Sequence, residues 1–574
     1  MAQVRASIRT LFLSAILLLA CCGKQPAEQP APVNETGIAF SYVDITGTAG
    51  LDSFQHETGA TGDKYFPEAM GAGAAFIDYN DDGWQDILLV GGGQWDNETD
   101  TSVPALWLYK NLGDATFEDA TAEAGLEGIE AYGYGLTIGD YDNDGDDDIY
   151  FTTLGPNYLL ENRAGVFVDV SVAANAQAGA TWSTTPVFFD ADLDGWLDLY
   201  VGNYVDWSPE KDIFCTLDGT VKSYCTPELY TGLPSRFLHN NGDGTFTDQT
   251  EAAGFLPSPG KMLGAAVFDY NGDHWPDLVV ASDTQPDLLY KNNGDGTFVE
   301  LGALSGLAYD ENGRARAGMG IDTGVIDTSG RHSVFVGNFS KEMIAVFGHV
   351  GGDLFVDRAA ASQIGRPSLM TLTFGLFLFD PDLDGDLDLF AANGHVQEEI
   401  AVTQDGITYA QPPHLFLNDG AGKFADAAPE IGGVLDAPLV GRGAAYADID
   451  RDGDLDILIT ENGGKAHLWR NDQETERAWL RVSVQGTAAN RSGLGTKLVA
   501  YHGGAAQERW IRGGSSFMAQ HEQVATWGFG SAPAVIDSLV VYWPGGARQQ
   551  FDKVLTNREF RIVQDVEVEE IVSP

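Results

Sequence analysis

Short apolar runs alternate with clusters of acidic and turn-forming residues along most of the chain. Residues 86–90 (DILLV) are one such run, and their pattern predicts a buried strand. The preceding residues 78–86 (DYNDDGWQD) place oxygen-bearing side chains at positions 1, 3, 5 and 9 and a glycine at position 6. Alternate oxygens of this kind converge on a hard cation, the carbonyl at position 7 adds a ligand, and glycine permits the sharp turn. This stretch therefore predicts a strand, a calcium loop and a second strand.

The same pattern recurs along the chain, which is typical of a repeat protein. Six copies are intact, beginning at residues 78, 140, 190, 269, 380 and 448, although the fourth has His274 in place of glycine. A further copy, residues 320–335, keeps its strands but has Arg331 and Phe335 at ligand positions, so no ion is expected there. One such motif alone could be a solvated turn, but six copies in register favour about six structural Ca²⁺ sites. The predicted ligands, with position 7 contributing its carbonyl, are Asp78, Asn80, Asp82, Trp84, Asp86, Asp140, Asp142, Asp144, Asp146, Asp148, Asp190, Asp192, Asp194, Trp196, Asp198, Asp269, Asn271, Asp273, Trp275, Asp277, Asp380, Asp382, Asp384, Asp386, Asp388, Asp448, Asp450, Asp452, Asp454 and Asp456.

A second motif, an aromatic residue followed by any residue and an acid, lies between successive loops. It often follows an Asn-Gly turn, as in residues 240–248 (NNGDGTFTD), which is typical of a β-hairpin. Each unit thus contains about four strands, as a propeller blade does. Seven loop segments are followed by only six aromatic–acid segments, and residues 42–44 (YVD) supply the missing one before the first loop. The sequence therefore predicts an all-β, seven-bladed β-propeller over residues 38–472, closed by its N-terminal strand.

The repeats end near residue 473, and the chain continues with short alternating strands such as residues 479–484 (WLRVSV). Glycine-containing turns separate these strands. We expect a small β domain over residues 473–565 and an acidic tail over residues 566–574.

The first twenty residues are typical of a bacterial export signal. Arg5 and Arg9 precede an apolar run, residues 11–20, that is too short to span a bilayer. Residues 18–21 (LLAC) resemble a lipobox, so we expect a signal peptide over residues 1–20, lipid attachment to Cys21 and a flexible tether over residues 21–37. An ordinary secretory signal is the alternative. Because Cys22 rather than aspartate follows Cys21, the expected location is the outer membrane of a Gram-negative envelope.

The charge balance is extreme, with 84 acidic and 32 basic residues and a formal net charge of −52. Such a chain is unsuited to binding nucleic acid or anionic lipid surfaces, and calcium ions would offset part of the charge. Two cysteines, Cys215 and Cys225, remain beyond the N-terminal pair. In an exported protein their spacing favours a disulfide that braces a surface loop. Free thiols or half of a metal site are the alternatives.

The repeats resemble FG-GAP (VCBS-type) repeats, and the whole arrangement resembles the cartilage acidic protein 1 family. In that family a propeller is followed by an ASPIC/UnbV domain, whose matching residues here are 490–495 (NRSGLG), 512–514 (RGG) and 543–545 (WPG). Residues 56–59 (HETG) and 66–71 (FPEAMG) also resemble the entry into that family's first blade. The resemblance implies calcium at the six intact loops, an extracytoplasmic location and an adhesive role, and it implies no reaction for the bacterial members.

The sequence contains no nucleophile elbow, no HExxH zinc motif and no dinucleotide-binding glycine loop after a strand. We therefore expect a calcium-rigidified surface module that binds an unknown protein or glycan through residues 91–104 and 206–234. The alternative is a hydrolase of polysaccharides or phosphoesters that uses one open calcium as a Lewis acid, with His56 and Glu68 as the candidate pair. A third hypothesis is a scaffold for other envelope proteins, with the C-terminal domain as the docking element.

Overall fold

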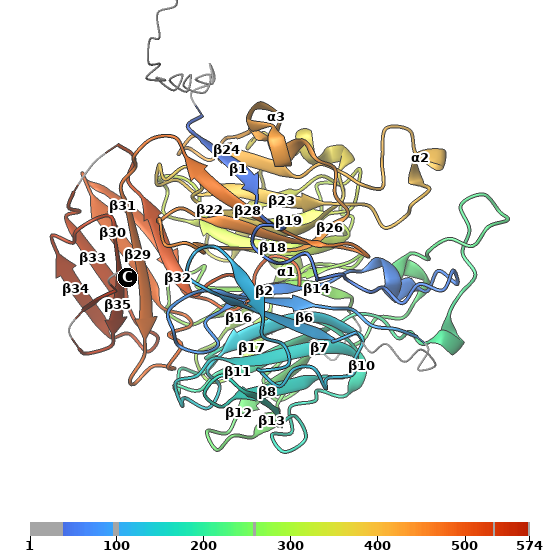
Figure 1. Cartoon of the computed structure of the whole chain (residues 1–574), viewed down its shortest axis with the longest axis horizontal. Helices are drawn as coiled ribbons and strands as arrows, with labels where there is room; N and C mark the ends of the chain where they lie inside the picture. Colours follow the sequence, from blue (N-terminus) through green and yellow to red (C-terminus); the bar gives the residue numbers. More distant parts are fainter. Residues whose placement is uncertain (1–37, 96–102, 256–259, 532–533, 567, 572–574) are drawn as a thin grey trace, which may run out of the picture. The chain divides into compact units, whose positions relative to one another are not determined.

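The structure, a computed structural model, describes residues 38–95, 103–255, 260–531, 534–566 and 568–571. Strands dominate these residues, and no helix among them is long and apolar enough to cross a bilayer. The all-β class predicted from the sequence is confirmed (Figure 1). The short helices are α1 (Gly302–Ser305), α2 (Ile400–Thr403), α3 (Ala428–Ile431) and the 3-10 turns Phe66–Ala69, Pro209–Lys211, Pro227–Leu229, Pro367–Met370 and Gly433–Asp436.

Described residues 40–473 form seven four-stranded units, numbered 1 to 7 along the chain. In units 1 to 6 the strands pair antiparallel in chain order, because short turns join most successive strands. Units 2 and 3 are also joined through a pairing of β7 with β10. Units 1 to 3 contain β2 (Ala74–Ile77), β3 (Asp86–Val90), β4 (Leu106–Asn111), β5 (Phe117–Asp119); β6 (Gly133–Gly139), β7 (Asp148–Pro156), β8 (Tyr158–Asn162), β9 (Phe167–Asp169); and β10 (Ala180–Phe189), β11 (Asp198–Asn203), β12 (Arg236–Asn240), β13 (Phe246–Asp248). Units 4 to 6 contain β14 (Met262–Phe268), β15 (Asp277–Ser282), β16 (Leu288–Asn292), β17 (Phe298–Glu300); β18 (Gly318–Val325), β19 (His332–Asn338), β20 (Ala345–Gly351), β21 (Leu354–Asp357); and β22 (Thr373–Phe379), β23 (Asp388–Asn393), β24 (His414–Asn418), β25 (Phe424–Asp426).

Unit 7 combines both ends of the repeat region. Its strands β26 (Gly441–Ala447), β27 (Asp456–Glu461) and β28 (Ala466–Gln473) follow one another, and β1 (Phe40–Asp44) pairs antiparallel with β28 (Figure 1). The register places Phe40 opposite Gln473 and Asp44 opposite Trp469. The N-terminal strand therefore covers what would otherwise be an exposed strand edge.

The first strands of neighbouring units lie against one another. Contacts join β2 to β6, β10 to β14, β14 to β18, β18 to β22 and β22 to β26, and β26 also contacts β2. Glycines allow this close approach, because a Cβ at Gly264 would lie 2.2 Å from the Met319 carbonyl oxygen and one at Gly320 would lie 2.0 Å from that of Phe374. The small residues that precede each metal loop in the sequence thus serve packing between units.

Residues 479–571, called here the C-terminal segment, form two four-stranded sheets. Its buried residues Trp527 and Trp543 belong to one apolar core with Tyr150 and Leu199 of units 2 and 3. Residues 569–571, within the stretch that the sequence indicates as an acidic tail, form β36 and cover the edge of β35. The strands are β29 (Trp479–Gln485), β32 (Val524–Gly528), β35 (Arg558–Val563), β36 (Glu569–Ile571) in one sheet and β30 (Lys497–His502), β31 (Ala505–Trp510), β33 (Ser538–Tyr542), β34 (Arg548–Asp552) in the other.

The link between β31 and β32, residues 511–523, runs along the first strands of the repeat units. Ser516 exchanges two backbone hydrogen bonds with Ile321 of β18, at 2.7 and 3.0 Å. The backbone N–H of Gln520 donates to the carbonyl of Ala74 in β2 at 3.0 Å. This link therefore fastens the C-terminal segment to units that lie far apart in the sequence, a contact that the sequence did not reveal.

Candidate metal sites and their surroundings

The six loops close in the same way. Each begins directly after a first strand, and the aspartate at position 1 accepts the backbone N–H of position 6, as Asp140 does from Gly145 at 2.8 Å. The N–H of position 7 donates to the carboxylate at position 5, as Asp146 does to Asp144 at 2.9 Å. The aspartate at position 9 is the first residue of the second strand, as in Asp148 of β7. In the Asp140 loop the backbone N–H of Asp144 also donates to Asp140 Oδ1 at 3.0 Å and to Asp142 Oδ1 at 3.2 Å.

Several of these acidic groups could hold a metal ion. In four loops three carboxylates bring ligand atoms within 4.8 Å of one another. The Asp78 and Asp269 loops have asparagine at position 3 but share the same hydrogen bonds between positions 1 and 6. A further cluster joins His239 of β12 to Asp192 and Asp198, and sequence reasoning did not include this histidine. The four clusters are Asp140, Asp142 and Asp148; Asp190, Asp192 and Asp194; Asp380, Asp382 and Asp384; and Asp448, Asp450 and Asp456.

Several buried carboxylate oxygens of the loops have no hydrogen-bond partner among the described residues, as ligands of a cation would. Such an oxygen is costly unless a donor or a metal satisfies it. The donor set is carboxylate, amide and carbonyl oxygen, which suits hard divalent cations rather than metals that prefer thiolate. The residues present therefore fit a hard cation. Seven loop carboxylates have such an oxygen among the described residues, namely Asp190, Asp277, Asp380, Asp388, Asp448, Asp450 and Asp454.

Burial in the loops raises the pKa of their aspartates. The pKa lies at about 7 for Asp78, Asp140 and Asp380 and at about 8 for Asp86 and Asp190, against an ordinary value of 3.8. Burial is the largest cause in each case, and neighbouring carboxylates of the same loop add to it. Without a cation, these groups favour the protonated state in the folded protein.

The stability of the metal-free protein should therefore fall as the pH rises. Because the folded-state pKa values exceed those of the unfolded chain, the protonated loops contribute their full stability below about pH 4 and lose it as the pH passes about 7 to 8. We expect protein stripped of calcium and moved into calcium-free buffer to melt at a higher temperature at pH 5.5 than at pH 8. Calcium-loaded protein should change much less over this range, and equal pH dependence of the two forms would contradict this account of the loops.

His274 occupies a position where glycine is favoured. Its φ is +71°, and the corresponding residues of the other five loops are glycines with φ between +84° and +109°. A left-handed conformation costs an ordinary residue about 1 to 2 kcal/mol. We expect His274→Gly to stabilise the calcium-loaded protein by about 1 kcal/mol, measured as a shift of the urea midpoint. The control His274→Ala removes the imidazole but keeps the strain, so it should stay close to the native protein, and equal stabilisation by both would refute the conformational explanation.

The turn between the first two strands of unit 5 is shorter than the repeat pattern predicted. Val325 pairs with His332, so only residues 326–331 separate its first two strands, whereas residues 380–387 separate Phe379 from Asp388 in unit 6. His332 thus takes the register of the ninth aspartate, and its Nε2 lies 3.0 Å from Glu508 Oε1 of the C-terminal segment. Phe335, predicted at a ligand position, instead lies within β19 and is buried. The predicted ligand position of Phe335 was wrong because this turn is shorter than the corresponding loop of unit 6.

Six asparagines that sequence reasoning missed support the loops. In unit 2 the backbone N–H of Asn162 donates to Asp148 Oδ1 at 2.7 Å, which holds the ninth aspartate in place. Its Nδ2 donates to the carbonyl of Tyr79 at 2.8 Å, in the loop of unit 1. The signal was available, since an asparagine stands at or near the end of the third strand in each unit with an intact loop. The set is Asn111, Asn162, Asn240, Asn292, Asn418 and Asn471.

Arginines of the C-terminal segment contact the first aspartates of three loops. Arg481 Nε lies 3.1 Å from Asp448 Oδ2, and Arg509 NH2 lies 3.5 Å from Asp380 Oδ2. Arg491 Nε lies 3.8 Å from Asp140 Oδ2. These three loops therefore lie beside the C-terminal segment, which contacts the first aspartate of each.

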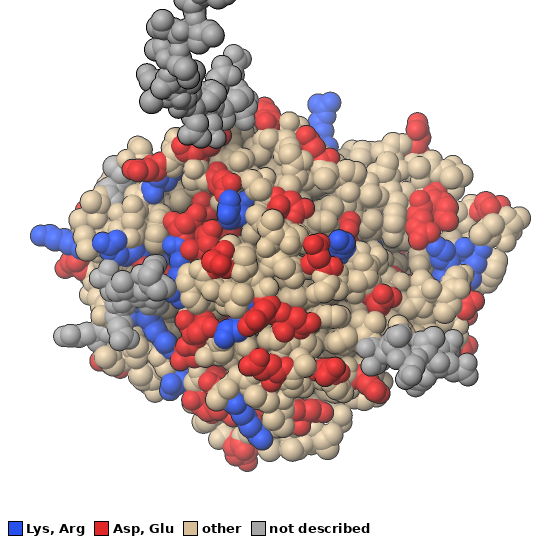
Figure 2. Space-filling model, in the orientation of Figure 1, with Lys and Arg blue, Asp and Glu red and all other residues tan. Residues whose placement is uncertain are grey.

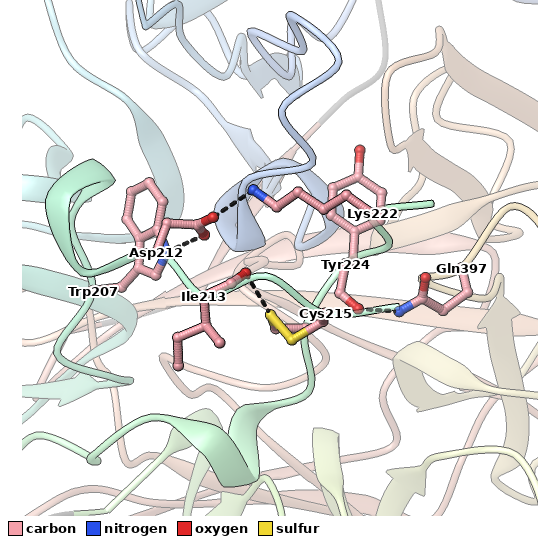
Figure 3. Close-up of a disulfide and its surroundings, with 8 residues drawn as sticks. Trp207, Asp212, Ile213, Cys215, Lys222, Tyr224 and Gln397 are labelled. Atoms are coloured by element: carbon pink, nitrogen blue, oxygen red, sulfur yellow. Dashed lines mark hydrogen bonds and ion pairs between the residues drawn. A yellow bond between two sulfur atoms is a disulfide. The ribbon is translucent and has the colours of Figure 1, made fainter. Parts of the chain in front are cut away.

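Cys215 and Cys225 form a disulfide in the long connection between β11 and β12, which extends away from the sheets (Figures 1 and 3). Lys222 Nζ donates to Asp212 Oδ2 at 2.5 Å, and Trp207 Nε1 donates to Asp212 Oδ1 at 3.0 Å. Gln397 Nε2 donates to the carbonyl of Tyr224 at 2.5 Å, which joins this connection to unit 6 (Figure 3). The bridge and these polar contacts therefore constrain the loop.

The candidate catalytic pair His56 and Glu68 is bound into loop contacts. His56 Nδ1 accepts the backbone N–H of Gly463 at 2.9 Å, and burial is the main cause that lowers the pKa of His56 to about 3. The Glu68 carboxylate accepts hydrogen bonds from Trp95 Nε1 and Tyr224 Oη, each at 3.1 Å. Both side chains are buried. Their bonds hold separate loops together, which is the role expected of structural residues.

Comparison with protein-family models identifies the family of the repeats. The FG-GAP-like repeat model matches residues 78–151, 140–201, 211–280, 269–336 and 380–459, which together exceed half of the chain. The chain belongs to the FG-GAP-like repeat family. The ASPIC and UnbV model matches residues 486–569, within the C-terminal segment. The resemblance noted in the sequence is therefore confirmed for both parts of this FG-GAP-repeat protein.

Curated relatives of this FG-GAP-repeat protein carry the name cartilage acidic protein 1. The Mus musculus protein is 24% identical over 72% of this chain and 70% of its own length. The Xenopus tropicalis protein is 23% identical over 87% of this chain and 74% of its own length. Among solved structures, an exotype rhamnogalacturonan lyase overlaps 86% of this chain and 91% of its own, with 13% identity and a TM-score of 0.32. Similarity at that level does not extend to function.

Proposed function

We propose that this protein is a calcium-binding β-propeller that serves as an exported surface module for binding a protein or a glycan. The observation that carries the proposal is the set of buried loop carboxylate oxygens that have no hydrogen-bond partner among the described residues. These groups supply only oxygen ligands, and each loop lies between two strands. Ca²⁺ meets both conditions, because it takes six to eight oxygen ligands in flexible geometry.

The seven units are proposed to be the blades of one closed ring over residues 38–472. Three contacts support closure: β1 pairs with β28, β26 contacts β2, and Asn111 Nδ2 of unit 1 donates to the carbonyl of Ile449 in unit 7 at 2.9 Å. The last bond repeats the link that Asn162 makes from unit 2 to unit 1. A chain of equivalent bonds that returns from the first unit to the last is expected for a ring and not for an open solenoid.

Export and anchoring are part of the proposal. Cys21 and the rest of residues 1–37 lie outside the described residues, so lipid attachment rests on the lipobox pattern. The disulfide supports an oxidising compartment, since such bonds are rare in reducing cytosol. The formal net charge of −52 keeps such a surface module away from nucleic acid, and acidic side chains are prominent on the face shown in Figure 2. Mass spectrometry of the mature N-terminus would identify the lipid on Cys21.

The disulfide-braced connection is the proposed recognition loop. Phe214 is 64% exposed and Val221 is 65% exposed, which places large apolar side chains in solvent on a constrained loop. The other expected recognition element, residues 91–104, falls partly outside the described residues. A rigid loop with exposed apolar side chains loses little conformational entropy on binding.

The test is calcium-dependent capture from a detergent extract of the bacterial envelope, quantified by mass spectrometry. We expect proteins or glycans retained in calcium to be released by EGTA, and retention to fall at least tenfold for the double variant Phe214→Ser and Val221→Ser. The control Leu304→Ser changes a side chain that is 76% exposed in α1 and should leave retention unchanged. Equal retention by both variants would refute this placement of the binding surface.

The alternative, a calcium-dependent hydrolase of polysaccharides or phosphoesters, is favoured by one observation. A cleft with carboxylates on its walls borders two of the metal loops. Release of reducing sugar or phosphate by calcium-loaded protein, abolished by substitution of a carboxylate in that cleft and not by His56→Ala, would favour this alternative over a pure binding role.

A further inference from the structure

A polar cleft of about 600 Å³ separates the C-terminal segment from units 1 and 2. The Asp78 and Asp140 loops form one wall, and β29, β35 and the turn around Arg491 form the other. Its volume falls in the range of pockets that hold small organic ligands. Elsewhere the same segment packs closely on the repeat units, as the continuous core with units 2 and 3 shows. The cleft at units 1 and 2 is therefore a local interruption of this packing.

The loops that border the cleft differ from the others at position 8. This position is not among the predicted ligands of the ion. In the loops beginning at residues 190, 269, 380 and 448 it is Leu or Pro, whereas in the two loops at the cleft it is Gln85 and Asp147. Polar side chains occur at position 8 in the two loops that border the cleft and in none of the other four intact loops. Metal binding does not account for this difference.

Three guanidinium groups line the cleft, in a chain with only 32 basic residues. The side chains of Arg491 and Arg561 are about 40% exposed, and the carboxylates nearest to them, Asp140 and Asp81, lie 3.8 Å away. Among the described residues Arg491 Nε has no hydrogen-bond partner. Arg451 stacks over the Trp84 ring at 4.2 Å and its Nη2 donates to the carbonyl of Gly83, so the open donors are those of Arg491 and Arg561. Planar donors with open hydrogen-bonding capacity suit a carboxylate or sulfate, which accepts two parallel bonds from one guanidinium.

We propose that this cleft binds an acidic oligosaccharide, with its acid group on Arg491 and Arg561 and its hydroxyls on Gln85, Gln485 and Asp147. Amides, which both donate and accept hydrogen bonds, and carboxylates, which accept several, suit a polyol better than a peptide side chain. The apolar residues at the base, such as Ile77 and Ile138, are buried and offer no pocket for an apolar anchor. This inference rests on the proposed function, because calcium in the two loops must neutralise the ligand aspartates before an anion can approach. The other carboxylates of the lining, Asp81, Asp146 and Glu559, remain as acceptors for sugar hydroxyls.

The test is titration calorimetry in 2 mM CaCl₂ with trigalacturonate, a mannuronate trimer and a hyaluronan tetrasaccharide, compared with neutral maltotriose. We expect at least one acidic sugar to bind with a Kd below about 100 µM and maltotriose to bind at least tenfold more weakly. Arg561→Gln should weaken the acidic sugar at least tenfold. The matched control Arg548→Gln changes an exposed arginine of β34 outside the cleft and should have less than a twofold effect.

A second measurement locates the bound sugar. The acidic sugar should protect Arg491 and Arg561 from phenylglyoxal modification, read by peptide mass spectrometry, and should leave Arg548 unprotected. No acidic sugar binding better than maltotriose, or equal losses in Arg561→Gln and Arg548→Gln, would overturn the inference. If the loops contain no calcium by elemental analysis, the proposed function fails; if they contain it and no acidic sugar binds, only this inference fails.

Discussion

Chelation of calcium by EGTA is expected to lower the melting temperature of this protein by about 3 to 9 °C relative to 2 mM CaCl₂. Extracellular sites of this kind bind calcium with Kd values of about 10⁻⁴ to 10⁻³ M. Binding to the native state alone then adds about 0.6 to 1.8 kcal/mol per site, and about 4 to 11 kcal/mol for six independent sites. The unfolding entropy of about 2.1 cal/mol/K per residue converts this free energy into the expected shift for a chain of 574 residues.

The shift should be measured by calorimetry and should be reversed when calcium is restored in excess over EGTA. Magnesium at the same concentration should restore less stability, because Mg²⁺ demands a smaller octahedral site and gives up its water reluctantly. The six loops lie in different units, so the loss should be spread over the repeat region in hydrogen exchange. An unchanged melting temperature in EGTA would show that the loops hold no ion that matters to stability.

The buried arginine Arg481 is expected to be the most sensitive single position between the repeats and the C-terminal segment. Its side chain is 2% exposed, and its two terminal nitrogens donate to Glu522 at 2.7 and 2.8 Å while its Nε lies 3.1 Å from Asp448. Removing one partner of a buried ion pair leaves an uncompensated charge and costs about 3 to 5 kcal/mol. We expect Arg481→Met to destabilise the calcium-loaded protein by this amount in urea unfolding.

Two further variants separate charge burial from lost packing. Arg548→Met alters an exposed arginine of the same segment and should stay within about 0.5 kcal/mol of the native protein. Adding Glu522→Gln to Arg481→Met removes the stranded charge and should recover part of the loss, since the remaining amide is cheaper to bury. If the double variant is less stable than Arg481→Met alone, the unpaired charge of Glu522 is not the cause.

Local patterns in the sequence predicted much of this structure. The spacing of Asp78, Asp82 and Asp86 predicted the strand–loop–strand unit, because metal loops and their strand ends are set by residues within ten positions. The mismatch between loop segments and aromatic–acid segments predicted the pairing of β1 with β28 across more than four hundred residues. The number and order of these segments sufficed for this prediction, because residues 42–44 match the segment that unit 7 lacks.

Contacts between distant parts of the chain were beyond the sequence pattern. The bond from Asn111 to Ile449 and the ion pair of Arg481 with Asp448 depend on how units and the C-terminal segment lie in space. The sequence did not predict the shorter turn of unit 5, because Asp327 and Ser329 stand where the first two loop ligands are expected. The strand register is instead set by the pairing of His332 with Val325. The polar cleft was hidden for the same reason, since its walls come from residues near 80, 147, 485 and 561.

Calcium stoichiometry, measured by elemental analysis of protein lacking residues 1–22 after dialysis against low-micromolar free calcium and again at 2 mM, tests the central claim most directly. The account predicts an approach to six calcium ions per chain at 2 mM, and about five when Asp380→Asn and Asp384→Asn disable one loop. Markedly fewer ions at 2 mM, with a transition metal retained instead, would contradict the assignment of the loops as calcium sites.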